Sequence, residues 1–256
     1  MSKVTIYTCV TGGYDNLPQP EVLHPDFEFV SFVKKGTKKS DSDGAWQVRE
    51  LDFDDSSNVV VSRYPKLNPH KVLPDVEYSL WMDANVSVIG SGFYDTVLSK
   101  VEEGVLYAGI RHPLRDDLGE EALRCLATDK ETFRGALKVW KHLRSEGYIR
   151  HSGMLENNII LRKHSDPTVM AVDEMWWDAF MKVSHRDQLS LMLCMQKAGL
   201  EPSLLLPEGM DSRTCPDLRY SAHVGIASSR GNCYIARKVR DAHREIEKLL
   251  FRTIIG

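Results

Sequence analysis

Runs of β-branched and aromatic residues alternate along this chain with stretches whose apolar residues have helical spacing. Strand-like apolar runs occupy residues 3–10, 27–34, 46–53, 78–82, 105–110 and 154–161. A further apolar run, residues 59–64, leads into a segment with two prolines, Pro65 and Pro69. The first strand enters a glycine-containing turn, and the run at 78–82 stops abruptly at Asp83.

Helical spacing follows from residue 92 onward, at residues 92–103, 120–146, 167–183, 187–198 and 237–254. Gly199 is placed to end the fourth of these helices. Residues 213–232 have little periodicity, which predicts an irregular loop. Strands alternating with helices predict an α/β fold, which we expect to be a single domain over residues 1–256 with a C-terminal helix at about 235–254.

The charge balance adds little to this picture. The 33 basic and 36 acidic residues give a formal net charge of -3, which disfavours a nucleic-acid partner. Five widely spaced cysteines without a C-x-x-C pair indicate a reducing compartment. With no signal-peptide pattern at the start and no apolar run of about 20 residues, we expect a cytoplasmic protein without a transmembrane segment. The basic C-terminal helix is suited to peripheral contact with a membrane or a partner.

The acidic turn after the strand at 78–82 is the first candidate site. Asp83 and Asn85 stand two residues apart and can direct two oxygens at one hard cation, with phosphate oxygens and water completing the shell. Mn²⁺ or Mg²⁺ prefers such ligands. Asp83 could equally cap the following turn, and the spacing alone leaves both interpretations open.

Two further segments offer contacts for a nucleotide. Thr11, Gly12, Tyr14 and Asp15 follow the first strand, where ligands bind in open α/β sheets, although their composition is also that of an ordinary turn and lacks the G-x-G-x-x-G pattern. Arg63, Lys66 and His70 form a basic, proline-stiffened segment before the acidic strand. These cations suit a diphosphate, and a solvated basic surface is the alternative.

Several motifs together resemble the family of glycosyltransferase-like proteins known as domain of unknown function 616. The resemblance covers nearly the whole chain. It is carried by Tyr7-Thr8 through Tyr14-Asp15, Arg63-Tyr64-Pro65-Lys66 with Pro69-His70, Ser79 through Asn85, His151 through Asn157, Trp176-Trp177 and Ser184 through Ser190. Most of these motifs are unspecific alone, and together they make the resemblance specific.

The resemblance implies a GT-A, Rossmann-like fold with a mixed, mainly parallel sheet between helices. In GT-A enzymes an Asp-x-Asp motif holds a divalent metal on the nucleotide-sugar diphosphate, and here that motif would be Asp83-Ala84-Asn85. Asparagine removes one negative charge, so weaker metal binding is expected. By similarity to glycogenin-like enzymes, His223 would be a third ligand and Asp187-Gln188 would face the sugar, while Glu156 is the best carboxylate on the acceptor side.

Each of these assignments has a structural alternative. His223 could be an ordinary surface or core histidine, Asp187 a first-turn residue of a helix, and Glu156 a hydrogen-bonded strand-end residue. If the resemblance holds, the protein is a hexosyltransferase that moves a sugar from a nucleoside diphosphate sugar, with UDP favoured, to a glycan or lipid-linked acceptor in polysaccharide biosynthesis. The rival functions are a metal-dependent hydrolase and a non-catalytic nucleotide- or carbohydrate-binding module.

Overall fold

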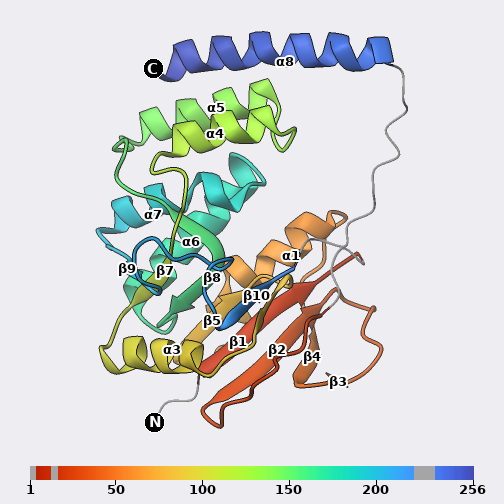
Figure 1. The fold of residues 1–256 in the computed structure, drawn as a ribbon, viewed down its shortest axis with the longest axis vertical. Helices are drawn as coiled ribbons and strands as arrows, with labels where there is room; N and C mark the ends of the chain where they lie inside the picture. Colours follow the sequence, from red (N-terminus) through yellow and green to blue (C-terminus); the bar gives the residue numbers. More distant parts are fainter. Residues whose placement is uncertain (1–3, 13–16, 222–233) are drawn as a thin grey trace.

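An eight-stranded mixed sheet forms the centre of the protein (Figure 1). The computed structural model describes residues 4–12, 17–221 and 234–256. In sheet order, the strands are β3 (Ser42–Asp43), β4 (Trp46–Glu50), β2 (Phe27–Val33), β1 (Val4–Val10), β5 (Tyr78–Met82), β8 (Leu155–Arg162), β7 (Tyr107–Arg111) and β9 (Ser203–Leu204). A separate antiparallel pair consists of β6 (Val86–Val88) and β10 (Leu218–Tyr220).

The sheet is largely parallel, as expected. Strands β4, β2, β1 and β5 run parallel to one another, and β9 is parallel to β7. β8 is antiparallel to both of its neighbours, and the short β3 is antiparallel to β4. β1 is buried on both faces, as a central strand of a parallel sheet must be, which explains its nearly continuous apolar sequence.

Helices cover both faces of the sheet and add two outer layers. They are α1 (Asn58–Leu67), α2 (Pro69–Val72), α3 (Gly92–Glu102), α4 (Leu118–Ala127), α5 (Phe133–Ser145), α6 (Pro167–Lys182), α7 (Leu191–Ala198) and α8 (Tyr234–Ile255), with a 3₁₀ turn at Asp187–Leu189. α3 packs on one face of the sheet, whereas α1, α6 and α7 pack on the other. α4 and α5 lie beyond α7, and α8 lies outermost (Figure 1). The α/β prediction is therefore confirmed.

Helix α1 occupies a segment that the apolar pattern did not assign to a helix. Its first turn is rich in valine, which favours strands, and Pro65 lies inside it. The side chain of Ser57 caps the helix by accepting from the backbone N–H of Val60. Burial of Val60, Val61 and Leu67 against the sheet outweighs the local preference.

The long helix expected over residues 120–146 is two helices, α4 and α5. The chain turns at Asp129, which has a positive φ of 57°. The Thr132 hydroxyl then caps α5 by accepting from Gly135 N at 3.0 Å. Both helices bury apolar residues in the same small core, so the helical spacing continues across the break.

The short strand β10 interrupts the predicted irregular loop because Leu218 pairs with Val88 of β6.

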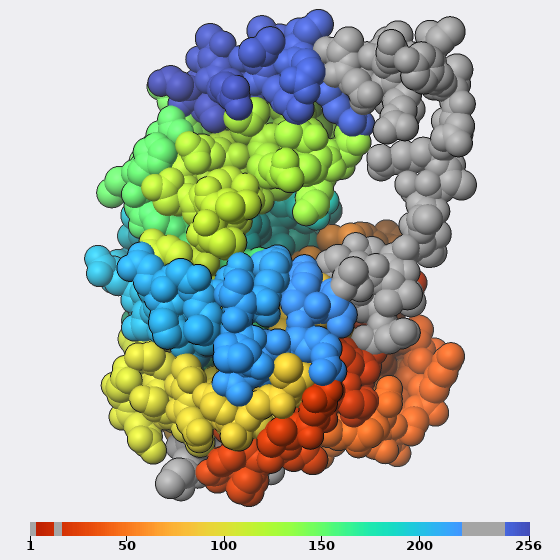
Figure 2. Space-filling view, in the orientation of Figure 1, coloured from red at the N-terminus to blue at the C-terminus, as the bar shows by residue number. Residues whose placement is uncertain are grey.

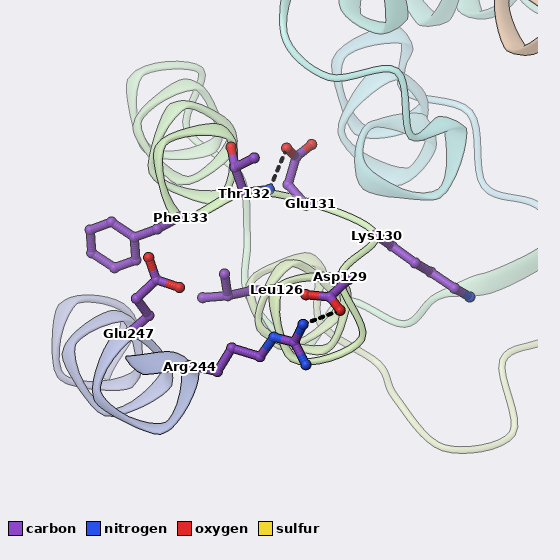
Figure 3. Close-up of a pocket in the computed structure, with 8 residues that line it drawn as sticks. All are labelled: Leu126, Asp129, Lys130, Glu131, Thr132, Phe133, Arg244 and Glu247. Atoms are coloured by element: carbon purple, nitrogen blue, oxygen red, sulfur yellow. Dashed lines mark hydrogen bonds and ion pairs between the residues drawn. The ribbon is translucent and has the colours of Figure 1, made fainter. Parts of the chain in front are cut away.

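Helix α8 forms an outer layer on α4 and α5 (Figure 2). Phe251 is fully buried between these helices. Arg244 pairs with Asp129 at the end of α4, beside a pocket of about 410 Å³ (Figure 3). Among the described residues, none of the helices has an apolar stretch that could span a bilayer.

Candidate functional site

The turn with predicted nucleotide contacts and the turn with the predicted metal ligands meet at one edge of the sheet. β1 and β5 are parallel neighbours, with Tyr7 opposite Trp81, so the turns that follow them lie side by side. After β1, the Thr11 hydroxyl donates to the carbonyl oxygen of Asn58 at 3.2 Å.

Gly12 has a φ of +65°, and a Cβ there would lie 2.5 Å from the Asn58 side-chain nitrogen. This left-handed backbone conformation favours glycine at the position. Tyr14 and Asp15, the other two predicted nucleotide contacts of this turn, lie outside the described residues.

Four charged side chains from three distant segments meet after β5, and we call Arg63, Lys66, Asp83 and Asp187 the charge cluster. Lys66 Nζ lies 2.6 Å from Asp187 Oδ2 and 3.4 Å from Asp83 Oδ1. Arg63 Nε lies 3.5 Å from Asp187 Oδ1. The indole N–H of Trp81 donates to Asp83 Oδ1 at 2.7 Å. The structure thus joins the predicted basic segment, the acidic turn and the Asp-Gln motif.

The charge cluster has a buried half and an open half. The side chains of Lys66 and Asp187 are only 2% and 12% exposed, whereas those of Arg63 and Asp83 are 29% and 28% exposed. A ligand therefore meets Arg63 and Asp83 first. Lys66 neutralises both carboxylates from beneath, a role that its sequence position did not suggest.

Electrostatics keep Asp187 and Arg63 of the charge cluster ionised. Burial by itself would raise the pKa of Asp187, but Lys66 and Arg63 hold it well below its ordinary value. Burial would likewise lower the pKa of Arg63, yet the carboxylates of Asp187 and Asp83 raise it. Two cations and two carboxylates thus balance in a partly buried site, so any bound anion alters the balance strongly.

A buried arginine supports the charge cluster from behind. Arg162, on β8, is fully buried and pairs with Asp173 of α6 at 2.6 Å. Its guanidinium also donates to the Tyr7 hydroxyl and to the backbone carbonyl of Lys66, each at 2.6 Å. Arg162 therefore connects β1, α1 and α6 at Lys66, whose ammonium contacts both carboxylates of the charge cluster. Nothing in the local pattern of β8 distinguishes this arginine from a surface residue.

The turn at Asp83 presents a second oxygen from Asn85. Val86 N donates to Asp83 O at 2.9 Å, which closes the turn. Asn85 is buried, and its Nδ2 donates to the carbonyl oxygen of Ser221 at 3.1 Å. Its Oδ1 is buried and has no hydrogen-bond partner within the described part of the chain. An amide oxygen held this way is available to a cation or a donor group.

The structure describes two of the three metal ligands expected from the sequence, Asp83 and Asn85. His223 lies outside the described residues. Over residues 4–12, 17–221 and 234–256, no group of three His, Cys, Asp or Glu side chains could hold a metal ion. Asp83 and Asn85 thus offer two oxygens, and a metal bound there would take its other ligands from the diphosphate and water.

Glu156 faces the same edge of the sheet. Its Oε1 pairs with Arg213 Nη1 at 2.7 Å, while its buried Oε2 has no partner among the described residues. Burial raises the pKa of Glu156 although Arg213 opposes the shift, and the charges of Asp211 and Asp83 raise it further. Glu156 and Asp83 therefore border one site. Arg213 was not a predicted site residue, and the segment before β10 has no periodicity that could single it out.

Gln188 has a structural contact that the motif did not reveal. Its Nε2 donates to Leu155 O at 2.5 Å, and its Oε1 accepts from Asn157 N at 3.2 Å. This amide anchors the turn that carries Asp187 to the start of β8. Asn157 is buried, and neither polar atom of its side chain has a partner in the described chain. Asn157 could have been identified from the sequence as a polar residue within an apolar strand.

His70 lies in α2, one turn beyond Lys66. Burial and the nearby charges of Lys71 and Arg162 lower the pKa of its imidazole. Both ring nitrogens are buried without hydrogen-bond partners among the described residues. A diphosphate contact by His70 stays a prediction, since no contact within that part of the chain joins it to the charge cluster.

Sequence comparison identifies the family of the chain. No curated protein matches the chain at a significant level. A family model described as TOD1/MUCI70, glycosyltransferase-like domain, matches residues 1–206, which include all of the charge cluster and Glu156 but not α8. The chain therefore belongs to the TOD1/MUCI70 glycosyltransferase-like domain family.

Proposed function

We propose that the protein transfers a sugar from a nucleoside diphosphate sugar to a hydroxyl group of a glycan or lipid-linked acceptor. The observation that carries this proposal is the charge cluster, which lies at the edge of the sheet where β1 and β5 end. Its more exposed residues are Arg63 and Asp83, and its buried residues are Lys66 and Asp187. Fold alone does not establish an activity, so the argument rests on this site and on the family.

Arg63 is the donor-facing cation in this proposal. Breaking the bond between sugar and diphosphate leaves negative charge on the diphosphate, and a fixed guanidinium stabilises that charge without reorganisation. Lys66 acts from below: it holds Asp83 and Asp187 in place and adds positive potential at the same point. Asp187 would face the sugar only if donor binding draws one of the two cations away from it.

Asp83 and Asn85 fit a divalent metal as two of its ligands. The unpartnered Asn85 Oδ1 supports this role, as does the open Asp83 carboxylate. Mn²⁺ or Mg²⁺ bound there would neutralise part of the diphosphate charge. Trp81 and Lys66 both contact Asp83 Oδ1, so they fix the carboxylate and leave its second oxygen as the ligand.

Glu156 is the acceptor-side carboxylate of the proposal. Its raised pKa and its unpartnered, buried Oε2 suit a group that takes a proton from an acceptor hydroxyl. Arg213 holds the other oxygen and so orients the carboxylate toward the site.

A thermal-shift screen tests the donor site. We expect one nucleoside diphosphate or its sugar to raise the melting temperature, and Asp83→Ala to remove the shift, because ligand binding to the native state stabilises it. Asp52→Ala is the matched control, since Asp52 is fully exposed and outside the site. No shift with any nucleotide at millimolar concentration would contradict the proposal. A shift without transfer or hydrolysis would instead identify a binding module.

The metal role is tested by Asn85→Asp. A second carboxylate would lose the bond to Ser221 O and add an unpaired buried charge, so the metal-free variant should be less stable by about 1–3 kcal/mol. Mn²⁺ should then raise its melting temperature more than that of the wild type, because ligand charge sets cation affinity. The double variant Asp83→Ala/Asn85→Asp should lose this gain. Equal responses to Mn²⁺ in all three proteins would rule the metal site out.

A further inference from the structure

Helix α8 has apolar side chains on two opposite sides. Phe251 and Ile255 face inward and are buried on α4 and α5. The other side exposes large residues at helical spacing, which we call the apolar strip: Ile246 (58% exposed), Leu249 (62%), Leu250 (53%) and Ile254 (44%). A surface helix normally places polar residues on its outer side. The strip is therefore a candidate for contact with another apolar phase.

A cationic hollow of about 630 Å³ lies between α4 and α8 beside the apolar strip. Its lining includes five cations and two carboxylates, namely Arg115, Arg124, Arg150, Lys248, Arg252, Glu120 and Glu245. Leu249 belongs to both the strip and the hollow, so the two surfaces are continuous.

The cations of the hollow differ in their partners. Arg115 pairs with Glu121, Arg150 with Asp117, and Lys248 with Glu245. For Arg124 and Arg252, the described part of the chain records no ion pair. These two guanidinium groups are therefore the ones available to an anion from outside. A guanidinium matches the geometry of a phosphate oxygen pair.

We propose that the apolar strip and the cationic hollow together dock the protein peripherally on an anionic phospholipid bilayer. The strip would enter the boundary between headgroups and acyl chains, and Arg124 and Arg252 would meet lipid phosphates. The composition of α8 suits an anionic surface, with six basic residues (Arg237, Lys238, Arg240, Arg244, Lys248 and Arg252) against three acidic ones (Asp241, Glu245 and Glu247).

A bilayer explains this surface better than a second copy of the chain. A two-fold contact places the same patch of both copies at one interface, so two surfaces with an excess of cations would meet. An anionic bilayer instead offers the opposite charge. The apolar strip lies outside residues 1–206, whereas α4 contributes part of the hollow, and neither surface includes a residue of the charge cluster. The inference does not depend on the proposed function.

Vesicle co-sedimentation tests the proposal with the full chain. We expect binding to vesicles of phosphatidylcholine with phosphatidylglycerol, weak binding to phosphatidylcholine alone, and loss of binding as salt screens the charges. Leu249→Ser/Leu250→Ser should lower the partition coefficient at least about tenfold, because both side chains leave water on docking. Leu23→Ser is the matched control, since Leu23 is 63% exposed on another part of the chain.

Two further variants separate charge from apolar contact. Arg124→Ser/Arg252→Ser should weaken binding to anionic vesicles and flatten its salt dependence, with an unchanged melting temperature as the check on folding. In Leu250→Trp, tryptophan emission should move to shorter wavelength on anionic vesicles as the indole leaves water.

No binding to either kind of vesicle would overturn the proposal. So would a dimer, seen by light scattering without lipid, that Leu249→Ser/Leu250→Ser dissociates. That second result would assign the strip to a second copy of the chain.

Discussion

Replacing Lys66 by methionine is expected to lower the free energy of unfolding by about 3 kcal/mol or more and to remove the thermal response to nucleoside diphosphates. Methionine fills a similar volume but leaves the buried carboxylate of Asp187 with Arg63 as its one partner in the charge cluster. Asp83 also loses its ammonium neighbour at 3.4 Å. Uncompensated charge at such a site costs more than the packing of one side chain restores.

The pH dependence of stability provides a second test of the Lys66→Met variant. In the wild type, the pKa of Asp187 in the folded state lies below its ordinary value of 3.8. The ionised carboxylate therefore stabilises the fold at neutral pH, and this contribution is lost as the pH falls below about 4. Without Lys66, burial is opposed by less positive charge, so the pKa of Asp187 rises and the loss of stability in acid becomes smaller.

Denaturant unfolding at about pH 7 and about pH 3.5 measures this difference. Lys71→Met is the control, because Lys71 is exposed and contacts the Asn68 side chain instead of a carboxylate. In the double variant Lys66→Met/Asp187→Asn, the destabilisation should be smaller than the sum of the two single effects, since neither charge is left alone. Additive effects, or a wild-type pH dependence in Lys66→Met, would refute the coupling.

Arg162→Met is the second variant with a large expected effect, about 3–5 kcal/mol of destabilisation. It leaves the fully buried carboxylate of Asp173 without its partner and removes hydrogen bonds to the Tyr7 hydroxyl and the Lys66 carbonyl. The double variant Arg162→Met/Asp173→Leu should recover much of this loss, because it removes both buried charges.

Arg162 also has a predicted positioning role that stability alone would not report. It fixes the backbone of Lys66, so Arg162→Met/Asp173→Leu should bind nucleoside diphosphates more weakly than the wild type even where its stability is restored. The neighbouring surface pair of Lys163 and Glu77 is the control, and Lys163→Met should change stability by less than about 1 kcal/mol. Wild-type nucleotide affinity in the double variant would show that Arg162 serves the fold alone.

Helix α1 shows where sequence reasoning was incomplete. Three consecutive valines and an internal proline give this segment a weak local preference for a helix. Its conformation comes from packing on β1 and α6, which no local pattern reports. The error matters for the site, because the helical turn sets Arg63 and Lys66 three residues apart on one side and directs both at Asp187.

The break between α4 and α5 has a different cause. Both helices bury one side in the core that they share with α8, so their apolar residues keep one spacing through the turn. The cap at Thr132 was visible as a residue type but not as a boundary, since threonine also occurs within helices. The pattern thus identified the helical content correctly and missed its division.

By itself, the sequence determined the α/β class, the order of the main strands and the position of Asp83 at the end of one of them, because hydrophobic periodicity and turn residues are local. It also identified each member of the charge cluster as a candidate. Only the tertiary structure decided that Arg63, Lys66, Asp83 and Asp187 meet, that Lys66 is buried beneath Asp83, and that Arg162 holds it there. Such contacts join residues far apart in the chain, and their strength depends on burial, which packing alone creates.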